Sequence, residues 1–228
     1  MCNLYSVITN QEAVRRLFAV ERDTTGNLPE LPGIFPDYVA PVIRTSADGA
    51  RELTMMRWGL PCPPGSGGGH VTNVRNTSSP HWQARLGPAH RCLVLATSFC
   101  EYADTRPRKT PTWFALGDGR PLFAFAGIWT PWTGTRGTKA NPVSGDHLLF
   151  GFLTCAANAT VRPVHPKAMP VILTSADEAA AWLAAPWPEA RGLQRPLPDG
   201  ALTIVARGGK EDPPPRVGEV TAGSPLLL

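Results

Sequence analysis

The sequence predicts an α+β fold: one compact domain of mainly antiparallel β-strands, arranged as a barrel or as two packed sheets, with a few short helices. Short apolar or β-branched runs outnumber the helix signals and do not alternate with them regularly, which argues against a parallel βαβ sheet. Hydrophobic residues make up 43% of the 228 residues and charged residues 18%, which excludes a fully disordered chain. The 25 prolines and 22 glycines predict short elements and many turns.

Helices are expected in three places, each identified by its termini. Residues 9–12 have the capping-box pattern Thr-Asn-Gln-Glu, and an apolar face follows. Pro80 after Ser79 and a downstream glycine, Gly87, bound a short second helix. Residues 175–178 form another capping box, which leads into an alanine-rich stretch that ends near Pro186.

The remaining patterned segments are predicted to be strands, namely residues 53–58, 92–97, 112–116, 122–129, 148–155, 171–173 and 202–205. Two segments rich in glycine, 61–69 and 134–145, predict mobile surface loops. We place the folded domain at residues 1–206. Residues 207–228 contain mostly Gly, Pro and polar residues, so we expect a disordered C-terminal tail.

Charge and cysteine content bound the function. The net charge of +4 permits a polyanionic partner without requiring one. The five cysteines are odd in number and include no C-x-x-C pair, so neither a disulfide framework nor a common zinc site is indicated, and no metal is expected. The longest nearly apolar run, residues 122–129, is far shorter than a membrane span, and no signal peptide precedes it. We expect a cytoplasmic protein with no membrane partner.

Cys2 is the first candidate catalytic residue. Initiator methionine is generally removed before a small side chain, which would leave Cys2 with a free α-amine (pKa about 7.7 to 8.0) and a thiol (pKa about 8.5). The amine can form a Schiff base with an aldehyde, and the thiol can then close a five-membered thiazolidine. Taken alone, however, a cysteine here is more often only a small residue near a chain end.

Three polar segments accompany Cys2. Residues 72–77, with Asn73 and Arg75, offer an amide, a guanidinium and hydroxyls in a loop, which on their own indicate only a helix entry. Glu101 ends an apolar strand between aromatic residues, where desolvation would raise its pKa toward the range useful for proton transfer; a salt-bridged or solvated carboxylate is the alternative. His165 is flanked by prolines and rigidly presented, which suits an acid or base, although a loop histidine is usually a surface residue.

These segments resemble the SRAP family, named for SOS-response-associated peptidases, whose members act as abasic-site shields. Seven motifs occur in the family's order and approximate spacing across nearly all of residues 1–206: Met1-Cys2, Trp58-Gly59-Leu60, Asn73-Val74-Arg75, Arg91-Cys92-Leu93-Val94, Phe99-Cys100-Glu101-Tyr102, Ala157-Asn158, and His165 with residues 169–173. The resemblance implies a single α+β domain that binds single-stranded DNA containing abasic sites. It further implies a stable thiazolidine between the exposed Cys2 and the ring-opened aldehyde of the abasic sugar.

The resemblance also implies a role for each matched residue. Cys2 is the nucleophile, Asn73 orients its amine and thiol, Glu101 takes a proton from the amine, and His165 assists sugar ring opening and release. The implied DNA-binding residues are Arg75 and Lys167 at phosphates, Trp58 stacking or wedging at a base, and Thr154 lining the same pocket. No cofactor or metal is implied, and we expect a monomer that is nucleoid-associated in the cytoplasm when bound to DNA.

The chain departs from the family pattern at three places. Leu4 replaces a phosphate-contacting arginine, Lys167 replaces an arginine and loses its bidentate fork, and Cys100-Glu101-Tyr102 replaces Tyr-Glu-Trp. None of these changes removes a proposed catalytic group.

Other functions stay open on the sequence alone. The same Schiff base could lead to β-elimination, which is an abasic-site lyase activity. A cysteine peptidase or autoprotease using Cys2 is the hydrolase alternative. A non-covalent single-stranded DNA-binding module, in which Cys2 has no role, is the non-enzymatic alternative. A metal site at His90 and Cys92 is least favoured, because the pair lacks further ligands at suitable spacing.

Overall fold

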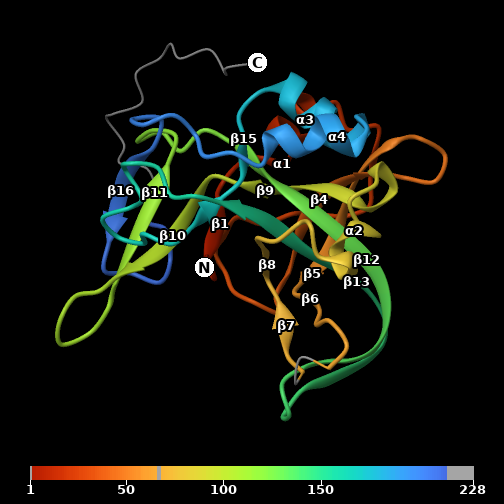
Figure 1. Ribbon diagram of the computed structural model, residues 1–228, viewed down its shortest axis with the longest axis horizontal. Coiled ribbons are helices and arrows are strands. Elements are labelled where there is room, and N and C mark those ends of the chain that lie inside the picture. The colour runs from red at the N-terminus through yellow and green to blue at the C-terminus, as the bar shows by residue number, and fades with distance from the viewer. Residues whose placement is uncertain (1, 66–67, 215–228) are drawn as a thin grey trace.

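The computed structural model describes residues 2–65 and 68–214, and it confirms the predicted fold class (Figure 1). Most strand pairs are antiparallel, and the strands form a five-stranded sheet, a nine-stranded sheet and a small hairpin. The parallel exceptions are the pairs β13–β5, β13–β8 and β2–β5. No helix in the described part of the chain is long and apolar enough to cross a membrane.

The five-stranded sheet brings the N-terminus beside Glu101. Its order is β16 (Thr203–Arg207), β11 (Thr110–Ala115), β10 (Ser98–Ala103), β1 (Tyr5–Val7) and β3 (Leu31–Ile34). Tyr5 is paired with Phe99, and the Cys100 amide donates to the Leu4 carbonyl at 2.8 Å. Because β1 and β10 are antiparallel, the chain leading back from Tyr5 to Cys2 runs toward Glu101.

The nine-stranded sheet carries most of the remaining strands. Its path is β14 (Met169–Pro170), β13 (Pro142–Cys155), β12 (Phe123–Gly137), β9 (Arg91–Ala96), β4 (Val39–Thr45), β5 (Arg51–Trp58) and β2 (Arg22–Asp23). Two further strands join it, β15 (Ile172–Leu173) on β12 and β8 (Asn73–Val74) on β13. The hairpin consists of β6 (Leu60–Pro61) and β7 (His70–Val71).

The helices are few and short, as predicted. They are α1 (Gln11–Leu17), α2 (Pro80–Gln83), α3 (Ala176–Ala184) and α4 (Trp187–Ala190), with 3-10 turns η1 (Pro88–His90) and η2 (Arg191–Leu193). The N-cap of α1 is Asn10, one residue later than the capping-box pattern implies, and its side chain accepts from the Glu12 amide at 2.7 Å. At α3 the Ser175 hydroxyl accepts from the Glu178 amide, as that pattern predicts.

An aromatic core lies directly behind the N-terminal strand. Tyr5 meets Trp58 edge-on with ring centroids 5.0 Å apart, and it also contacts Phe125 and Phe152. All four side chains are fully buried. Edge-to-face ring contacts of this kind favour one relative orientation of the rings, so they hold β1 against the nine-stranded sheet.

One of the two loop predictions is wrong. Residues 134–145, predicted as a mobile loop, are mostly the paired ends of β12 and β13, where Thr135 lies opposite Ser144 and their hydroxyls are 2.7 Å apart. Polar cross-strand pairs stabilise this ribbon where no apolar alternation exists to indicate strands. The glycine-rich stretch 61–69 connects β6 to β7; its residues 66 and 67 lie outside the described residues.

The predicted tail is also wrong in its first part. Asp212 is buried, and its amide donates to the Pro32 carbonyl at 2.9 Å. Its carboxylate pairs with Arg120, whose side chain is 5% exposed. Residues 207–214 therefore belong to the folded unit, because a buried ion pair of this kind fixes both partners. Residues 215–228 lie outside the described residues.

Candidate active site

Cys2 lies in the interior immediately before β1. Its side chain is 1% exposed, and the thiol donates to the Leu4 carbonyl at 3.4 Å. Burial raises the pKa of the Cys2 thiol well above its usual value, and repulsion from the Glu101 carboxylate raises it further. The thiol is therefore neutral at pH 7.

Asn73 fixes the backbone of Cys2. The Asn73 side-chain amide donates to the Cys2 carbonyl and to the Thr72 hydroxyl, both at 2.8 Å, and that hydroxyl donates to the Asn3 side chain. The resemblance implied contacts to the Cys2 amine and thiol, whereas the observed contact is to its carbonyl. Among the described residues, nothing pairs with the buried side-chain oxygen of Asn73.

Glu101 lies on β10 with its carboxyl group buried. The residue is 3% exposed, and burial raises the pKa of the carboxyl to about 7. Its Oε1 atom is buried and has no hydrogen-bond partner in the described part of the chain. The prediction that desolvation raises this pKa is confirmed. A carboxyl group that titrates near pH 7 can exchange protons in both directions, which suits general acid and base steps.

His165 faces Glu101 from the turn between β13 and β14. Its Nδ1 lies 4.0 Å from Glu101 Oε1 and 2.9 Å from the Ala168 carbonyl oxygen. Because a carbonyl only accepts, Nδ1 carries the proton and the lone pair of the neutral ring is on Nε2. The turn is held by Asn158, whose side-chain oxygen accepts from the Val161 amide, while the Val161 carbonyl accepts from the His165 amide.

Trp58 lies in the core, whereas the expected stacking on a base requires an exposed ring. Its ring is fully buried and contacts Tyr5 and Phe152. Its indole N–H donates to the Thr72 carbonyl at 3.1 Å, so the ring supports the chain next to Asn73. A large apolar ring is most stable in the core when its N–H has a partner, and both conditions are met here.

The other expected DNA-binding residues differ in exposure. Arg75 and Lys167 are exposed, whereas Thr154 is 1% exposed and pairs with Pro170 in the sheet. The side chain of Gln194 joins two of these positions by donating to the carbonyls of Arg75 at 2.9 Å and Thr154 at 3.1 Å. Sequence reasoning missed Gln194, because an isolated glutamine near prolines carries no recognisable signal.

Leu4, which stands where the family has an arginine, is fully buried with Cys100 and Trp113 in a small second core. Its side chain is therefore directed away from solvent, and a phosphate contact at this position is excluded in the observed conformation.

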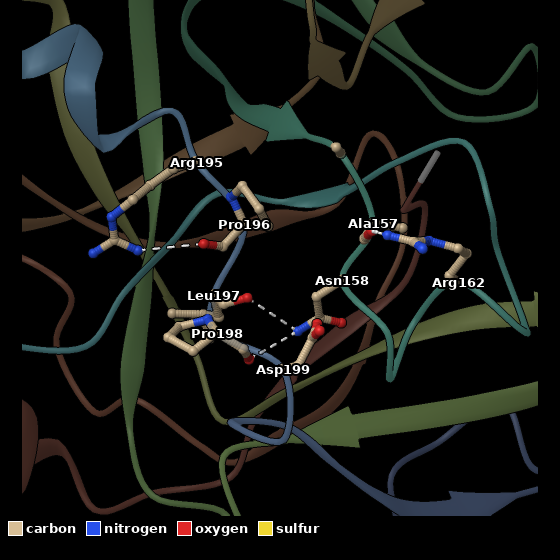
Figure 2. Close-up of a pocket in the computed structure, with 9 residues that line it drawn as sticks. Ala157, Asn158, Arg162, Arg195, Pro196, Leu197, Pro198 and Asp199 are labelled. Atoms are coloured by element: carbon tan, nitrogen blue, oxygen red, sulfur yellow. Dashed lines mark hydrogen bonds between the residues drawn. The ribbon is translucent and has the colours of Figure 1, made fainter.

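A surface cavity of about 450 Å³ lies beside the His165 turn (Figure 2). Arg162 and Arg195 stand on opposite sides of it, and the Asn158 amide donates to the Leu197 and Pro198 carbonyls at its floor. None of the four expected catalytic residues lines this cavity. Its contribution is structural, since Asn158 ties the turn that carries His165 to the segment after η2.

The four candidate catalytic residues thus come from four separate segments and converge around the N-terminus. They combine a thiol held neutral, a carboxyl group titrating near pH 7 and an imidazole close to that carboxyl. This set can transfer protons during condensation of a carbonyl compound with an amine and a thiol. Within residues 2–65 and 68–214, no group of three or more His, Cys, Asp or Glu side chains could hold a metal ion.

Comparison with known proteins identifies similar chains. The profile of the family described as "SOS response associated peptidase (SRAP)" matches residues 1–206. The abasic site processing protein YobE of Bacillus subtilis is 29% identical over 188 residues, covering 76% of this chain and 78% of the relative. The abasic site processing protein YoqW of the same organism is 29% identical over 191 residues, covering 78% of both.

Solved structures share the fold. A crystal structure of a Bordetella bronchiseptica protein has a TM-score of 0.69 at 24% identity and covers 91% of this chain and 98% of its own. A Bacteroides thetaiotaomicron protein has the same TM-score at 21% identity, covering 89% and 90% respectively. At these identities the likeness establishes the architecture alone.

Proposed function

The chain belongs to the SRAP family, and on that premise we propose that it processes abasic sites in single-stranded DNA by forming a covalent crosslink through Cys2. Two relatives that bear the name abasic site processing protein support this substrate class. The crosslink is a thiazolidine, formed after removal of Met1. It shields the abasic site during the response to DNA damage.

The observation that carries the proposal is a pair of unsatisfied acceptors beside Cys2. Among the described residues, Asn73 Oδ1 and Glu101 Oε1 are both buried and have no hydrogen-bond partner. Leaving a buried acceptor unpaired costs about 1 to 3 kcal/mol, so two such atoms near Cys2 favour the binding of a further donor there. A free α-amine on Cys2 supplies N–H donors at this end of the chain, and it suits both acceptors.

The reaction balances with the groups present. The Cys2 amine adds to the C1′ aldehyde of the ring-opened sugar to give a carbinolamine, and loss of water gives the Schiff base. The thiol then adds to the imine carbon, forming the C–S bond, and its proton ends on the ring nitrogen. The neutral amine attacks, and Glu101 accepts the proton that its nitrogen then loses and returns it to the departing hydroxide, which the pKa of about 7 favours.

His165 acts at the sugar. The neutral ring holds its proton on Nδ1 toward Ala168, which leaves Nε2 as the basic nitrogen. His165 takes the proton of the sugar C1′ hydroxyl, the bond from C1′ to the ring oxygen breaks, and the proton passes to that oxygen, which becomes the C4′ hydroxyl. The ring is then open to the aldehyde, and the same transfer in reverse closes it when the crosslink reverses. Arg75 and Lys167, both exposed, hold phosphates beside the lesion. No cofactor takes part, and the protein acts as a cytoplasmic monomer.

A peptidase using Cys2 as a thiolate is less well supported. Cysteine nucleophiles in hydrolysis need a pKa lowered by nearby positive charge. The environment of Cys2 does the opposite, because burial and the Glu101 carboxylate both raise the pKa of its thiol.

The test is intact-protein mass spectrometry before and after incubation with an oligonucleotide carrying one abasic site. We expect loss of Met1 and a one-to-one adduct that is stable to heat. Cys2→Ala should abolish the stable adduct, while Cys62→Ala, which alters the partly exposed cysteine after β6, should leave it unchanged. A heat-stable adduct on the Cys2→Ala protein would refute the thiazolidine.

A further inference from the structure

The loop between β10 and β11, residues 104–109, extends away from the body of the molecule (Figure 1). All six residues are exposed. Three of them, Arg106, Arg108 and Lys109, are positively charged, and one, Asp104, is negative. Arg207, also exposed, joins this cluster because β16 places it opposite Thr112 and it donates to the Thr112 hydroxyl at 3.3 Å.

This cluster has a local excess of positive charge. Its four cations and one anion give a net charge of +3, against +4 for all 228 residues. None of the four cations forms an ion pair with a carboxylate in the described part of the chain. Cations that lie within the screening length of about 10 Å at 0.1 M salt repel one another, and a polyanion relieves that repulsion.

The loop is held in shape by its own hydrogen bonds. The Thr105 hydroxyl lies 2.7 Å from the Arg108 carbonyl and 2.6 Å from the Thr110 hydroxyl, and the Thr105 amide donates to the Ala103 carbonyl at 2.9 Å. The three charged side chains are therefore carried on an ordered turn. Binding a ligand there costs less conformational entropy than ordering a flexible tail would.

The loop also begins close to the proposed reaction centre. Glu101 is on β10, and Asp104 is three residues further along the same strand direction. At about 3.3 Å per strand residue, Asp104 stands roughly 10 Å from Glu101. A DNA strand attached at Cys2 therefore has its neighbouring phosphates within reach of the loop.

We propose that Arg106, Arg108 and Lys109, with Arg207 at their base, form a phosphate-binding finger that holds the DNA strand on one side of the abasic site. The proposal rests on the function proposed above, and it adds a contact surface separate from Arg75 and Lys167. The ligand is the phosphodiester backbone, so the finger binds without regard to base sequence.

The test compares two triple variants that remove the same charge. Arg106→Gln/Arg108→Gln/Lys109→Gln changes the finger. Arg16→Gln/Lys139→Gln/Arg191→Gln removes three exposed charges elsewhere and serves as the matched control. Binding of a fluorescent single-stranded oligonucleotide without an abasic site is measured from 50 to 300 mM salt, after thermal melts establish that both variants are folded.

Single-strand binding falls with salt by about 0.7 log units per log unit for each phosphate contacted. The finger variant should therefore lose about 2 units of salt slope and at least tenfold in affinity at low salt. The control should keep the wild-type slope. Equal losses in the two variants would overturn the proposal, and so would a finger variant that binds DNA like the wild type. The proposal would also be overturned if the finger variant kept the wild-type salt slope on DNA but lost binding to an acidic protein.

A second arm gives the side of the lesion. Abasic oligonucleotides are shortened on the 5′ or the 3′ side, and the concentration for half-maximal crosslinking is measured. When the oligonucleotide is shortened on the side that the finger holds, the wild-type protein and the finger variant should need the same concentration for half-maximal crosslinking. When it is shortened on the other side, the difference between their concentrations should remain. If neither truncation changes the difference between the wild type and the finger variant, the finger is refuted but the proposed function is not. If the wild type forms no Cys2 adduct, the proposed function is refuted, whatever the salt slopes show.

Discussion

Replacing Asp212 tests whether the segment after β16 belongs to the fold. The carboxylate of Asp212 is fully buried and accepts from Arg120 Nε at 2.9 and 3.0 Å. It also accepts from the hydroxyls of Ser98 at 2.6 Å and Ser6 at 3.3 Å, which belong to β10 and β1. One side chain thus joins the C-terminal segment to both strands that lead to the candidate active site.

The expected cost follows from what Asp212→Ala leaves behind. Removing one partner of a buried ion pair strands the other charge, here Arg120, and costs about 3 to 5 kcal/mol. The serine hydroxyls add little, because those of Ser6 and Ser98 lie 2.7 Å apart and can pair with each other. For a protein of this size, 1 kcal/mol lowers Tm by about 2 to 4 °C, so we expect a decrease of roughly 10 °C.

Calorimetry and urea unfolding measure the effect, and two variants control it. Glu211→Ala alters the exposed neighbour and should change the stability by less than about 0.5 kcal/mol. Arg120→Met combined with Asp212→Leu removes both charges and should recover most of the loss. If Asp212→Ala melts within about 1 °C of the wild type, the segment contributes nothing to stability and the tail predicted from composition is correct after all.

Three further predictions concern the site. Glu101→Gln should slow crosslinking by about 100-fold and remove its rise through pH 7. Because the folded-state pKa of about 7 lies above the unfolded value, the wild type should lose roughly 3 kcal/mol of stability between pH 4.5 and 7, a loss absent from Glu101→Gln. Asn73→Ala should cost about 1 to 2 kcal/mol of unfolding free energy and slow crosslinking, because the Cys2 carbonyl loses its donor. Trp58→Phe should cost about 1 to 3 kcal/mol by removing the hydrogen bond to Thr72 and leaving a cavity, with no change in affinity for undamaged single-stranded DNA.

Each of these has a contradicting outcome. A pH–rate profile that survives in Glu101→Gln would assign the proton transfer to another group. Full-rate crosslinking by Asn73→Ala would mean that its contact with Cys2 is only structural. A specific loss of DNA affinity in Trp58→Phe, with stability unchanged, would place the indole on the DNA after all.

The sequence predicted those elements whose signal is local. The start of α3 follows from its capping pattern, and strand β9 follows from its apolar run. Each signal consists of a few neighbouring residues. β4 was missed because Pro41 interrupts its apolar pattern. Its pairing with β9 begins only at Val42, so the missing N–H of Pro41 is not needed there. The ribbon at 134–145 was missed because its strands pair through polar residues and glycines.

The candidate site divides in the same way. The raised pKa of Glu101 could be predicted because its aromatic and apolar neighbours are adjacent in sequence. The burial of Trp58 and the ion pair of Asp212 depend on segments far away along the chain, about 90 residues in the case of Asp212 and Arg120. A prediction that a tryptophan is exposed, or that a Gly/Pro-rich terminus is disordered, is correct only when no residue far away along the chain packs against that segment.

The protonation states at the site favour condensation over hydrolysis. Schiff-base formation needs an unprotonated amine and an acid to expel water, and it does not need a thiolate until the ring closes. Burial keeps the Cys2 thiol neutral and holds the pKa of Glu101 at about 7, so at neutral pH the carboxyl is divided between its acid and base forms. A thiolate protease would instead need positive charge at the sulfur. The low-dielectric environment that would disable Cys2 as a protease nucleophile therefore suits it to capture an aldehyde.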